Sequence, residues 1–364
     1  FKAMCHAEYR GFFHIGMVTR NERNAIIQHG TMTMVRRELL ERIGWSEWCI
    51  TEDAELGLRI LDEGYATTYI ARSYGRGLMP DTFLDFKKQR SRWAFGAMQI
   101  LRRHFDALIH GRDTGLTAGQ RYHFVAGWLP WLADGFNLLV NLAALAWSLV
   151  MVLFPRHIEP PLMLFSVLPL SLFLFKLVKL LHLYRARVGA TFTQTIAAAI
   201  AGLGLSHTVG SAMLSGFVNK DRPFFRTPRR TARHAWLESL AAAREEAVLM
   251  CGLWMAAFAV SSIPQMDGDQ PGLVGSPDLT VWVTVLLVQS IPYAAAVVVS
   301  LVSSLQLRGD WIGEARDPVF DASAAASEPD PDSIATGTSP LPVGSLARNN
   351  GGALPATAKL DSAK

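Results

Sequence analysis

Two adjacent carboxylates at the start of a predicted helix could do chemistry. Glu52 and Asp53 follow Thr51, and the apolar spacing after them predicts a helix that ends near Gly64. A carboxylate held where a loop enters a helix can take the proton from an attacking hydroxyl group, as a general base does. The same residues suit an ordinary helix start, because Thr caps the helix and acids complement its dipole. Alone, the tripeptide favours this second interpretation.

A second candidate group lies on one face of a predicted long helix. Gln89, Arg92 and Trp93 have i, i+3, i+4 spacing. A guanidinium can form paired hydrogen bonds with diphosphate oxygens, and an amide can donate beside it. An indole ring offers a flat surface to a sugar. The alternative is that the aromatic ring and the arginines anchor the helix at a membrane surface.

A third candidate group lies in a basic stretch between apolar segments. Phe224, Thr227 and Arg229 belong to this stretch, and its Thr and Arg could close over a nucleotide diphosphate. A basic loop on the cytosolic side of a membrane is the alternative interpretation, and without further context it is favoured.

The segments that carry these residues are of two kinds. The long apolar runs lie between residues 124 and 304, whereas residues 1–110 and 308–364 have a polar composition. This separation is typical of a water-soluble head joined to a membrane domain. The net charge of +4 comes from basic clusters beside the apolar runs, which suits an anionic lipid surface better than a nucleic acid. We therefore expect the lipid bilayer, and no nucleic acid, as a partner.

The head shows alternating strand and helix patterns. Residues 31–35 and 66–71 predict short strands, and residues 36–43 and 51–63 predict helices that are each followed by a glycine. This order predicts part of an α/β sheet. The basic and aromatic pattern of residues 81–110 predicts a helix at the lipid–water interface.

Four segments are apolar and long enough to cross a bilayer, which needs about 20 helical residues. They are residues 124–154, 161–184, 245–263 and 279–304. Residues 191–218 are richer in Ser, Thr, Gly and His, and we expect them to lie on the membrane, because the basic stretches then share the cytosolic side with the head. Residues 306–364 are rich in Ala, Ser, Pro and Gly and predict a disordered cytosolic tail.

The order of these pieces resembles cellulose synthase and its relatives among the family-2 glycosyltransferases. T-E-D at residues 51–53 is followed by Q-x-x-R-W at residues 89–93, then by membrane segments, and then by F-x-x-T-P-R at residues 224–229 before the last two spans. The resemblance extends from residue 1 to about residue 305 and rests on the combination of the motifs.

The resemblance implies a fold for each part of the chain. Residues 1–80 would be the C-terminal part of an α/β glycosyltransferase A-type domain, and residues 81–122 an interfacial helix with a linker. Residues 123–305 would form an all-α transmembrane domain. Residues 219–235 in this domain would be a gating-type loop.

The resemblance also implies a role for each candidate residue. Asp53 matches the general base of the family, with Thr51 and Glu52 beside it. The residues that match the motif for the donor diphosphate and the acceptor sugar are Gln89, Arg92 and Trp93.

Two further segments match family features. Gln28 to Thr31 falls where the family has an F-x-C-G-S-like segment on the acceptor side, so that His29, Gly30 and Thr31 are expected binding residues. The gating residues would be Phe224, Thr227 and Arg229, although Arg226 and Arg229 stand where cellulose synthases have Val and Lys.

The implied activity is the inverting transfer of a sugar, with glucose expected, from a UDP-sugar to a growing β-glycan. The catalytic domain would face the cytosol at the inner membrane. A glycolipid synthase with a lipid acceptor, such as a β-glucosyldiacylglycerol synthase, and a non-catalytic membrane fragment remain alternatives.

The family binds Mg²⁺ or Mn²⁺ through a D-x-D motif upstream of T-E-D, and this chain has no such motif there. D-G-D at residues 267–269 is predicted on the far side of the membrane and D-P-D at residues 330–332 in the tail, so we reject both as metal ligands. We therefore expect no metal ligands in this chain, and we expect the donor-binding N-terminal part to be missing from it.

Overall fold

The structure of the chain is a computed structural model. It describes residues 1–72, 75, 77–155, 157–161, 163–219, 241–266 and 277–305. The predicted gating-type loop, except for residue 219, and the predicted tail lie outside the described residues, so both stay predictions. The chain divides into two units, residues 1–316 and 317–364, and only the first contains described residues.

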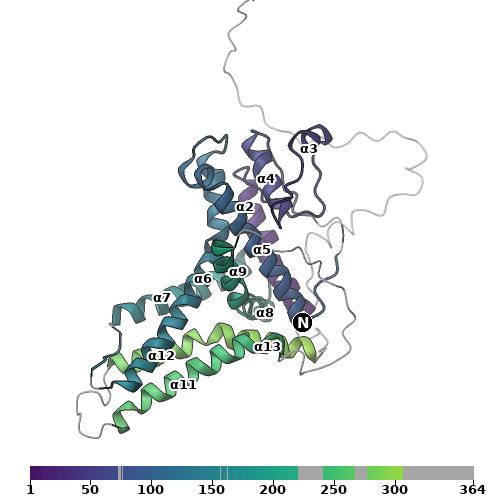
Figure 1. Cartoon of the computed structure of the whole chain (residues 1–364). Helices are drawn as coiled ribbons and strands as arrows, with labels where there is room; N and C mark the ends of the chain where they lie inside the picture. The colour runs from purple at the N-terminus through teal and green to yellow at the C-terminus, as the bar shows by residue number, and fades with distance from the viewer. Residues whose placement is uncertain are drawn as a thin grey trace, which may run out of the picture. The chain divides into compact units, whose positions relative to one another are not determined.

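The head begins with a continuous helical rod. Helix α1 (Lys2–Gly11), the π-helical turn η1 (Phe12–Met17) and helix α2 (Val18–Asn21) follow one another with helical backbone angles at each junction (Figure 1). Two shorter helices, α3 (Arg37–Ile43) and α4 (Glu52–Asp62), form where the apolar spacing predicts them. Each is followed by a glycine with positive φ, namely Gly44 at 69° directly after α3 and Gly64 at 82° two residues after the end of α4, a conformation that favours glycine.

The two predicted strands are not formed in the described part of the head. A strand needs a neighbour that pairs with its backbone, and the described residues supply none. In the extended segment 65–71, side-chain amides take part of that role. The Thr67 N–H donates to Asn24 Oδ1 at 2.6 Å, and the Tyr69 N–H donates to Asn21 Oδ1 at 2.7 Å. The strand prediction was therefore wrong for these residues, and the α/β sheet remains a proposal.

Helix α5 (Phe83–Arg103) is the central packing element of the described unit, and the π-helical turn η2 (Asp106–His110) follows it. Fully buried apolar side chains lie along α5, namely Phe83, Phe86, Phe95, Met98 and Ile100. The predicted helix of residues 81–110 is thus interrupted at His104. Its position at a lipid surface stays a prediction, but its packing shows that it belongs to the core.

The second half of the described unit is helical. Its elements are α6 (Ala118–Leu153), α7 (Met163–Leu183), η3 (Tyr184–Val188), α8 (Phe192–Leu203), α9 (Ser206–Val218), α11 (Arg244–Met266), α12 (Pro277–Gln289) and α13 (Ile291–Ser304). Helices α5 and α6 both pack on α9, and α1 packs on α8. Helix α5, which carries Gln89, Arg92 and Trp93, is therefore in direct contact with the apolar half of the unit.

Four helical stretches among the described residues are long and apolar enough to cross a membrane. They are residues 118–153, 192–218, 244–263 and 277–304. Three of them overlap predicted spans, and α7 covers most of the remaining one. The stretch 192–218 was predicted to lie on the membrane. It consists of two helices of 12 and 13 residues, each about 20 Å long or less, shorter than the hydrocarbon core of about 30 Å. Its placement on the membrane stays a prediction.

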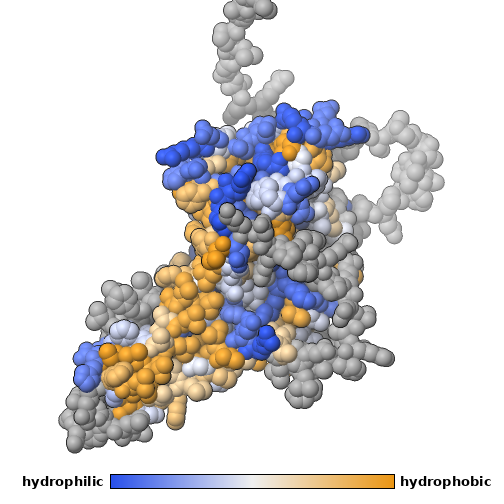
Figure 2. All heavy atoms as spheres, viewed as in Figure 1, coloured by the Kyte–Doolittle hydropathy of each residue, from blue (hydrophilic) through white to orange (hydrophobic). Residues whose placement is uncertain are grey.

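The surface agrees with a membrane environment for the long helices. Figure 2 shows apolar side chains gathered on the outside of these helices, whereas hydrophilic side chains cover much of the region of α2 to α4. Exposed apolar residues of α6 include Phe136, Leu139, Leu142 and Leu149. A water-soluble helix would not expose so many large apolar side chains, so lipid is the medium that suits this face.

Candidate functional site

The T-E-D segment is fixed against helix α5. Thr51 is the residue before the first turn of α4, and the Ile50 N–H donates to Gln99 Oε1 of α5 at 3.0 Å. The Gln99 amide also donates to the Trp48 carbonyl at 3.1 Å. A Cβ on Gly96 would overlap the Thr51 side chain, whose Cγ2 would lie 2.6 Å away. The glycine in α5 thus allows the T-E-D segment to pack one turn from the Q-x-x-R-W motif.

The segment of residues 28–31 lies beside Asp53. Gly30 has a φ of 74°, and a Cβ there would lie 2.7 Å from Asp53 Oδ2. Gly57 of α4 likewise leaves room for Gln28, whose Cβ would lie 2.9 Å from a Cβ at position 57. These two glycines allow the loop to approach the carboxylate. The Thr31 side chain, by contrast, is exposed to solvent.

His29 enters the site with the loop. Its ring lies 5.4 Å from the Phe13 ring and 6.4 Å from the Phe12 ring, measured between centroids. Burial lowers the pKa of His29, and the nearby Asp53 partly offsets this effect. The imidazole is therefore kept neutral at pH values where a free histidine begins to bind a proton.

Asp53 has the electrostatics of a base stronger than an ordinary aspartate. Burial raises its pKa, and Glu52 raises it further, whereas the Ala54 N–H and the guanidinium of Arg92 lower it. The Ala54 N–H donates to Asp53 Oδ1 at 2.8 Å, which leaves Oδ2 on the side of Gly30. A carboxylate with a raised pKa binds a proton more readily, as proton removal from a hydroxyl group requires.

The pH dependence of transfer should report this environment. A general-base role for Asp53 would require the ionised carboxylate, so the rate should then fall as the pH drops through its pKa, which is raised above the usual aspartate value. Because Arg92 lowers this pKa, Arg92→Gln should move the acid limb of the pH–rate profile to higher pH. Lys88→Gln is the matched control, because Lys88 is exposed on the same helix. An acid limb that stays in place in Arg92→Gln, or moves equally in Lys88→Gln, would contradict this electrostatic coupling.

The guanidinium of Arg90, inside the Q-x-x-R-W motif, is buried close to two aromatic rings. Arg90, which is 7% exposed, forms an ion pair with Glu8 of α1. Its guanidinium carbon lies 4.5 Å from the ring centroid of Tyr9 and 4.6 Å from that of Trp93. Such cation–π contacts hold a ring in place, and more strongly where water is excluded.

Tyr9 of helix α1 contacts two residues of the Q-x-x-R-W motif, Gln89 and Trp93. Its hydroxyl donates to Gln89 Oε1, and its ring meets Trp93 edge to face at a centroid distance of 5.9 Å. Since the amide oxygen of Gln89 accepts this bond, its NH₂ group is left to donate elsewhere. The sequence interpretation missed Glu8, Tyr9 and Arg90. Arg90 lies inside the motif, but no local spacing signals that helix α1 reaches it.

The structure provides no candidate metal centre among the residues it describes. No three His, Cys, Asp or Glu side chains in that part of the chain come together as metal ligands would. Asp53 and Glu52 alone do not fit a divalent ion, so we derive no step through a metal. The D-G-D and D-P-D sequences, and Phe224, Thr227 and Arg229, lie outside the described residues.

Comparisons with known proteins identify the family to which this chain is similar. The family model for glycosyl transferase family group 2 matches residues 5–186, half of the chain. A cellulose synthase 1 catalytic subunit [UDP-forming] of Komagataeibacter xylinus is 30% identical over 130 residues, which are 35% of this chain and 16% of that protein. A cellulose synthase catalytic subunit [UDP-forming] of Pseudomonas fluorescens is 34% identical over 125 residues, 34% of this chain and 16% of that protein.

A more distant comparison points to the same activity class. A probable glycosyltransferase of Bacillus subtilis, YdaM, is 30% identical over 73 residues, which are 20% of this chain and 17% of that protein. The chain therefore matches about one-sixth of the length of each of these three relatives. The family match over half of the chain, with the helices able to cross a membrane, shows that this chain belongs to the family-2 glycosyltransferases, in their membrane-bound, cellulose synthase-like group.

Proposed function

We propose that this chain carries the acceptor side of an inverting glycosyl transfer site. The observation that carries the proposal is the packing of the loop at Gly30 against Asp53 and of the T-E-D segment against helix α5, which bears Arg92. The substrate would be a UDP-sugar, with glucose expected, and the acceptor a growing β-glycan. The relatives named as UDP-forming cellulose synthases support this donor.

The proposed reaction is a single displacement at the anomeric carbon. Asp53 takes the proton of the acceptor hydroxyl as its oxygen forms the new bond to that carbon. The bond to the diphosphate oxygen breaks on the opposite face, UDP leaves, and the configuration is inverted. Arg92 and the free NH₂ group of Gln89 would donate hydrogen bonds to the departing diphosphate. Both proposed donors belong to α5, which also fixes the T-E-D segment.

Further parts of the proposal concern the whole protein. We infer an α/β A-type domain to which the described head contributes helices, and a catalytic face on the cytosolic side of the inner membrane. A divalent ion such as Mg²⁺ or Mn²⁺ would assist donor binding through ligands outside this chain. The loop with Phe224, Thr227 and Arg229 would act as the gating-type loop.

The role of Trp93 gives the experiment that tests the acceptor side. Trp93→Ala should raise the acceptor KM about tenfold, with a smaller effect on the donor KM, because an aromatic stacking contact is worth roughly 1.5 kcal/mol or less. The initial rate of UDP release would be measured against acceptor and donor concentration in turn. Trp45→Ala is the control, since Trp45 is 52% exposed elsewhere in the head. An unchanged acceptor KM in Trp93→Ala would rule out the stacking role.

A further inference from the structure

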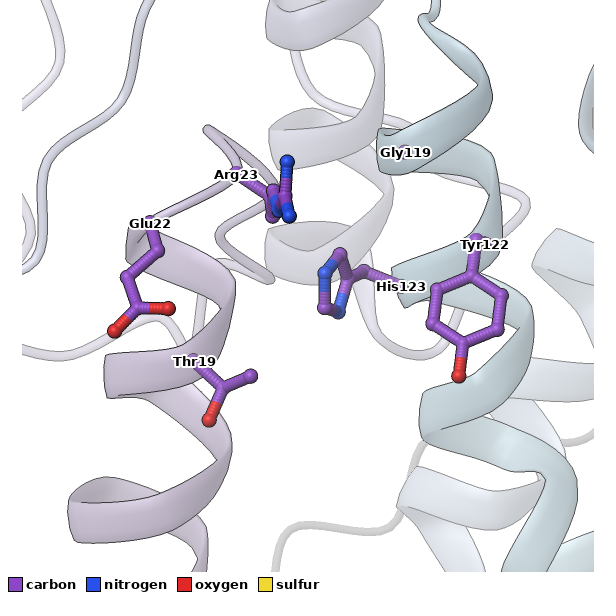
Figure 3. A pocket seen from close by; sticks show the side chains of 6 residues that line it. All are labelled: Thr19, Glu22, Arg23, Gly119, Tyr122 and His123. Atoms are coloured by element: carbon purple, nitrogen blue, oxygen red, sulfur yellow. The ribbon is translucent and has the colours of Figure 1, made fainter.

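A cavity of about 410 Å³ lies between helix α2 and the first turns of α6, and it shares no residue with the site around Asp53. The lining residues are Thr19, Glu22, Arg23, Gly119, Tyr122 and His123 (Figure 3). Figure 3 shows His123 projecting from α6 toward Arg23, whereas the carboxylate of Glu22 points away from both. The facing side chains are thus a guanidinium and an imidazole.

A second guanidinium lies between the same two helices. A Cβ on Gly127 of α6 would overlap Nη2 of Arg20, and a Cβ on Gly16 would lie 2.7 Å from its Nη1. Gly119, His123 and Gly127 are four residues apart and share one face of α6. Arg20 and Arg23 are both close enough to act electrostatically on the His123 ring. Arg23 therefore lines the cavity, and Arg20, which is not among the lining residues, lies beside it along the same face of α6.

Arg20 has no counter-charge among the residues that the structure describes. Its Nε is buried without a hydrogen-bond partner, and no described carboxylate lies within ion-pair distance of it. Burial lowers the pKa of Arg20, with no acid to offset the effect. A guanidinium N–H that is buried without an acceptor is unfavourable, and an anion that reaches Arg20 would accept this hydrogen bond.

The position of the cavity indicates where the anion comes from. Gly119 lies in the first turn of α6, whose N-terminus adds partial positive charge. The apolar run of α6 begins directly after His123, so on the predicted spans the cavity lies at the head end of the first span. Phosphate groups of anionic lipids are found at this depth and attract basic side chains.

We propose that the cavity between α2 and α6 binds a phosphate group, which in the membrane is the headgroup phosphate of an anionic phospholipid. Arg20 and Arg23 donate to the phosphate oxygens, and the α6 N-terminus faces the same charge. This proposal is independent of the transferase proposal, because no residue of the site around Asp53 takes part. Lipid binding can therefore fail while sugar transfer is retained.

The test measures lipid binding to the protein in neutral detergent. Phosphatidylglycerol and phosphatidylcholine would be titrated separately, and bound lipid counted by native mass spectrometry. Wild type should bind phosphatidylglycerol at least tenfold more tightly than phosphatidylcholine. The Arg20→Gln/Arg23→Gln double variant should lose this preference. Arg112→Gln, which removes an equal charge at an exposed position of the head, should keep it.

Two further measurements use a single variant and inorganic phosphate. Arg23→Gln alone changes an exposed side chain and should weaken phosphatidylglycerol binding severalfold even if the double variant folds poorly. Inorganic phosphate would be titrated against the thermal midpoint. A stabilisation by phosphate that needs Arg20 and Arg23, without a preference for phosphatidylglycerol, would support the phosphate site and identify its source as soluble. Equal phosphatidylglycerol binding by wild type and Arg23→Gln, or an equal loss in Arg112→Gln, would overturn the proposal.

Discussion

Asp53→Asn is expected to reduce sugar transfer by about 10²- to 10⁴-fold, the usual contribution of a general base. The amide keeps the shape of the side chain, and its oxygen can still accept the hydrogen bond from the Ala54 N–H at the start of α4. It cannot take the acceptor proton, so the loss should appear in the rate of transfer. Donor binding should remain within about threefold of wild type, because the resemblance places the diphosphate at Gln89 and Arg92. The initial rate of transfer from UDP-glucose and the Kd for UDP would be measured on the same preparations.

Glu38→Gln provides the matched control for this experiment. Glu38 is an exposed carboxylate of α3 in the same head, and its loss should leave both the rate and the Kd unchanged. Transfer by Asp53→Asn at more than one-tenth of the wild-type rate would exclude Asp53 as the base. A loss of UDP binding equal to the loss of rate would instead assign Asp53 to donor binding.

Arg90→Met is expected to destabilise the protein by about 3–5 kcal/mol, as removal of one partner from a buried ion pair does. Glu8, whose side chain is 22% exposed, would be left without its partner, and burial already raises the pKa of its carboxyl group. The Trp93 ring would also lose the guanidinium stacked on it. The free energy of unfolding would be compared between the variants in one detergent.

The Glu8→Gln/Arg90→Met double variant separates the charge from the packing. It leaves no uncompensated carboxylate, so it should recover part of the lost stability although it lacks both charges. Its acceptor KM should stay raised, because the ring of Trp93 remains without support. A double variant no more stable than Arg90→Met would show that the ion pair does not dominate the effect.

The helices of the head were predictable because their signals are local. In α3 and α4, apolar spacing and a following glycine define the element, and the structure places both ends within one or two residues of the prediction. The strands were not predictable in the same way, since pairing depends on residues distant in the sequence. Residues 65–71 are extended as their composition suggests, but Asn21 and Asn24 satisfy backbone groups that a neighbouring strand would otherwise pair with.

The candidate site shows the same division between local and distant information. The motifs at Asp53 and Trp93 were visible as residue types at fixed spacing, and the family resemblance joined them. The contacts that bring the segments together were not visible, because they depend on the absence of a side chain at Gly30 and Gly96. Arg90 was passed over because its burial comes from helix α1, which no local pattern connects to α5.

The membrane helices were predictable from length and composition, and their boundaries largely agree with the long helices of the structure. For residues 191–218, the charge context and the hydropathy lead to different predictions of membrane placement. Their charge context favours a place on the membrane, whereas their joint length and hydropathy would allow a crossing. The break between α8 and α9, and their packing on α1 and α5, are tertiary features that composition does not report.

Inverting transfer would be measured on the product that the natural protein makes in lipid bilayers supplied with labelled UDP-glucose. We expect release of UDP and incorporation of glucose through a β-linkage, which nuclear magnetic resonance of the anomeric proton identifies. Because the donor sugar is α-linked to UDP, a β-linked product records inversion. An α-linked product would exclude inversion, and no UDP release with any UDP-sugar would exclude the proposed transfer.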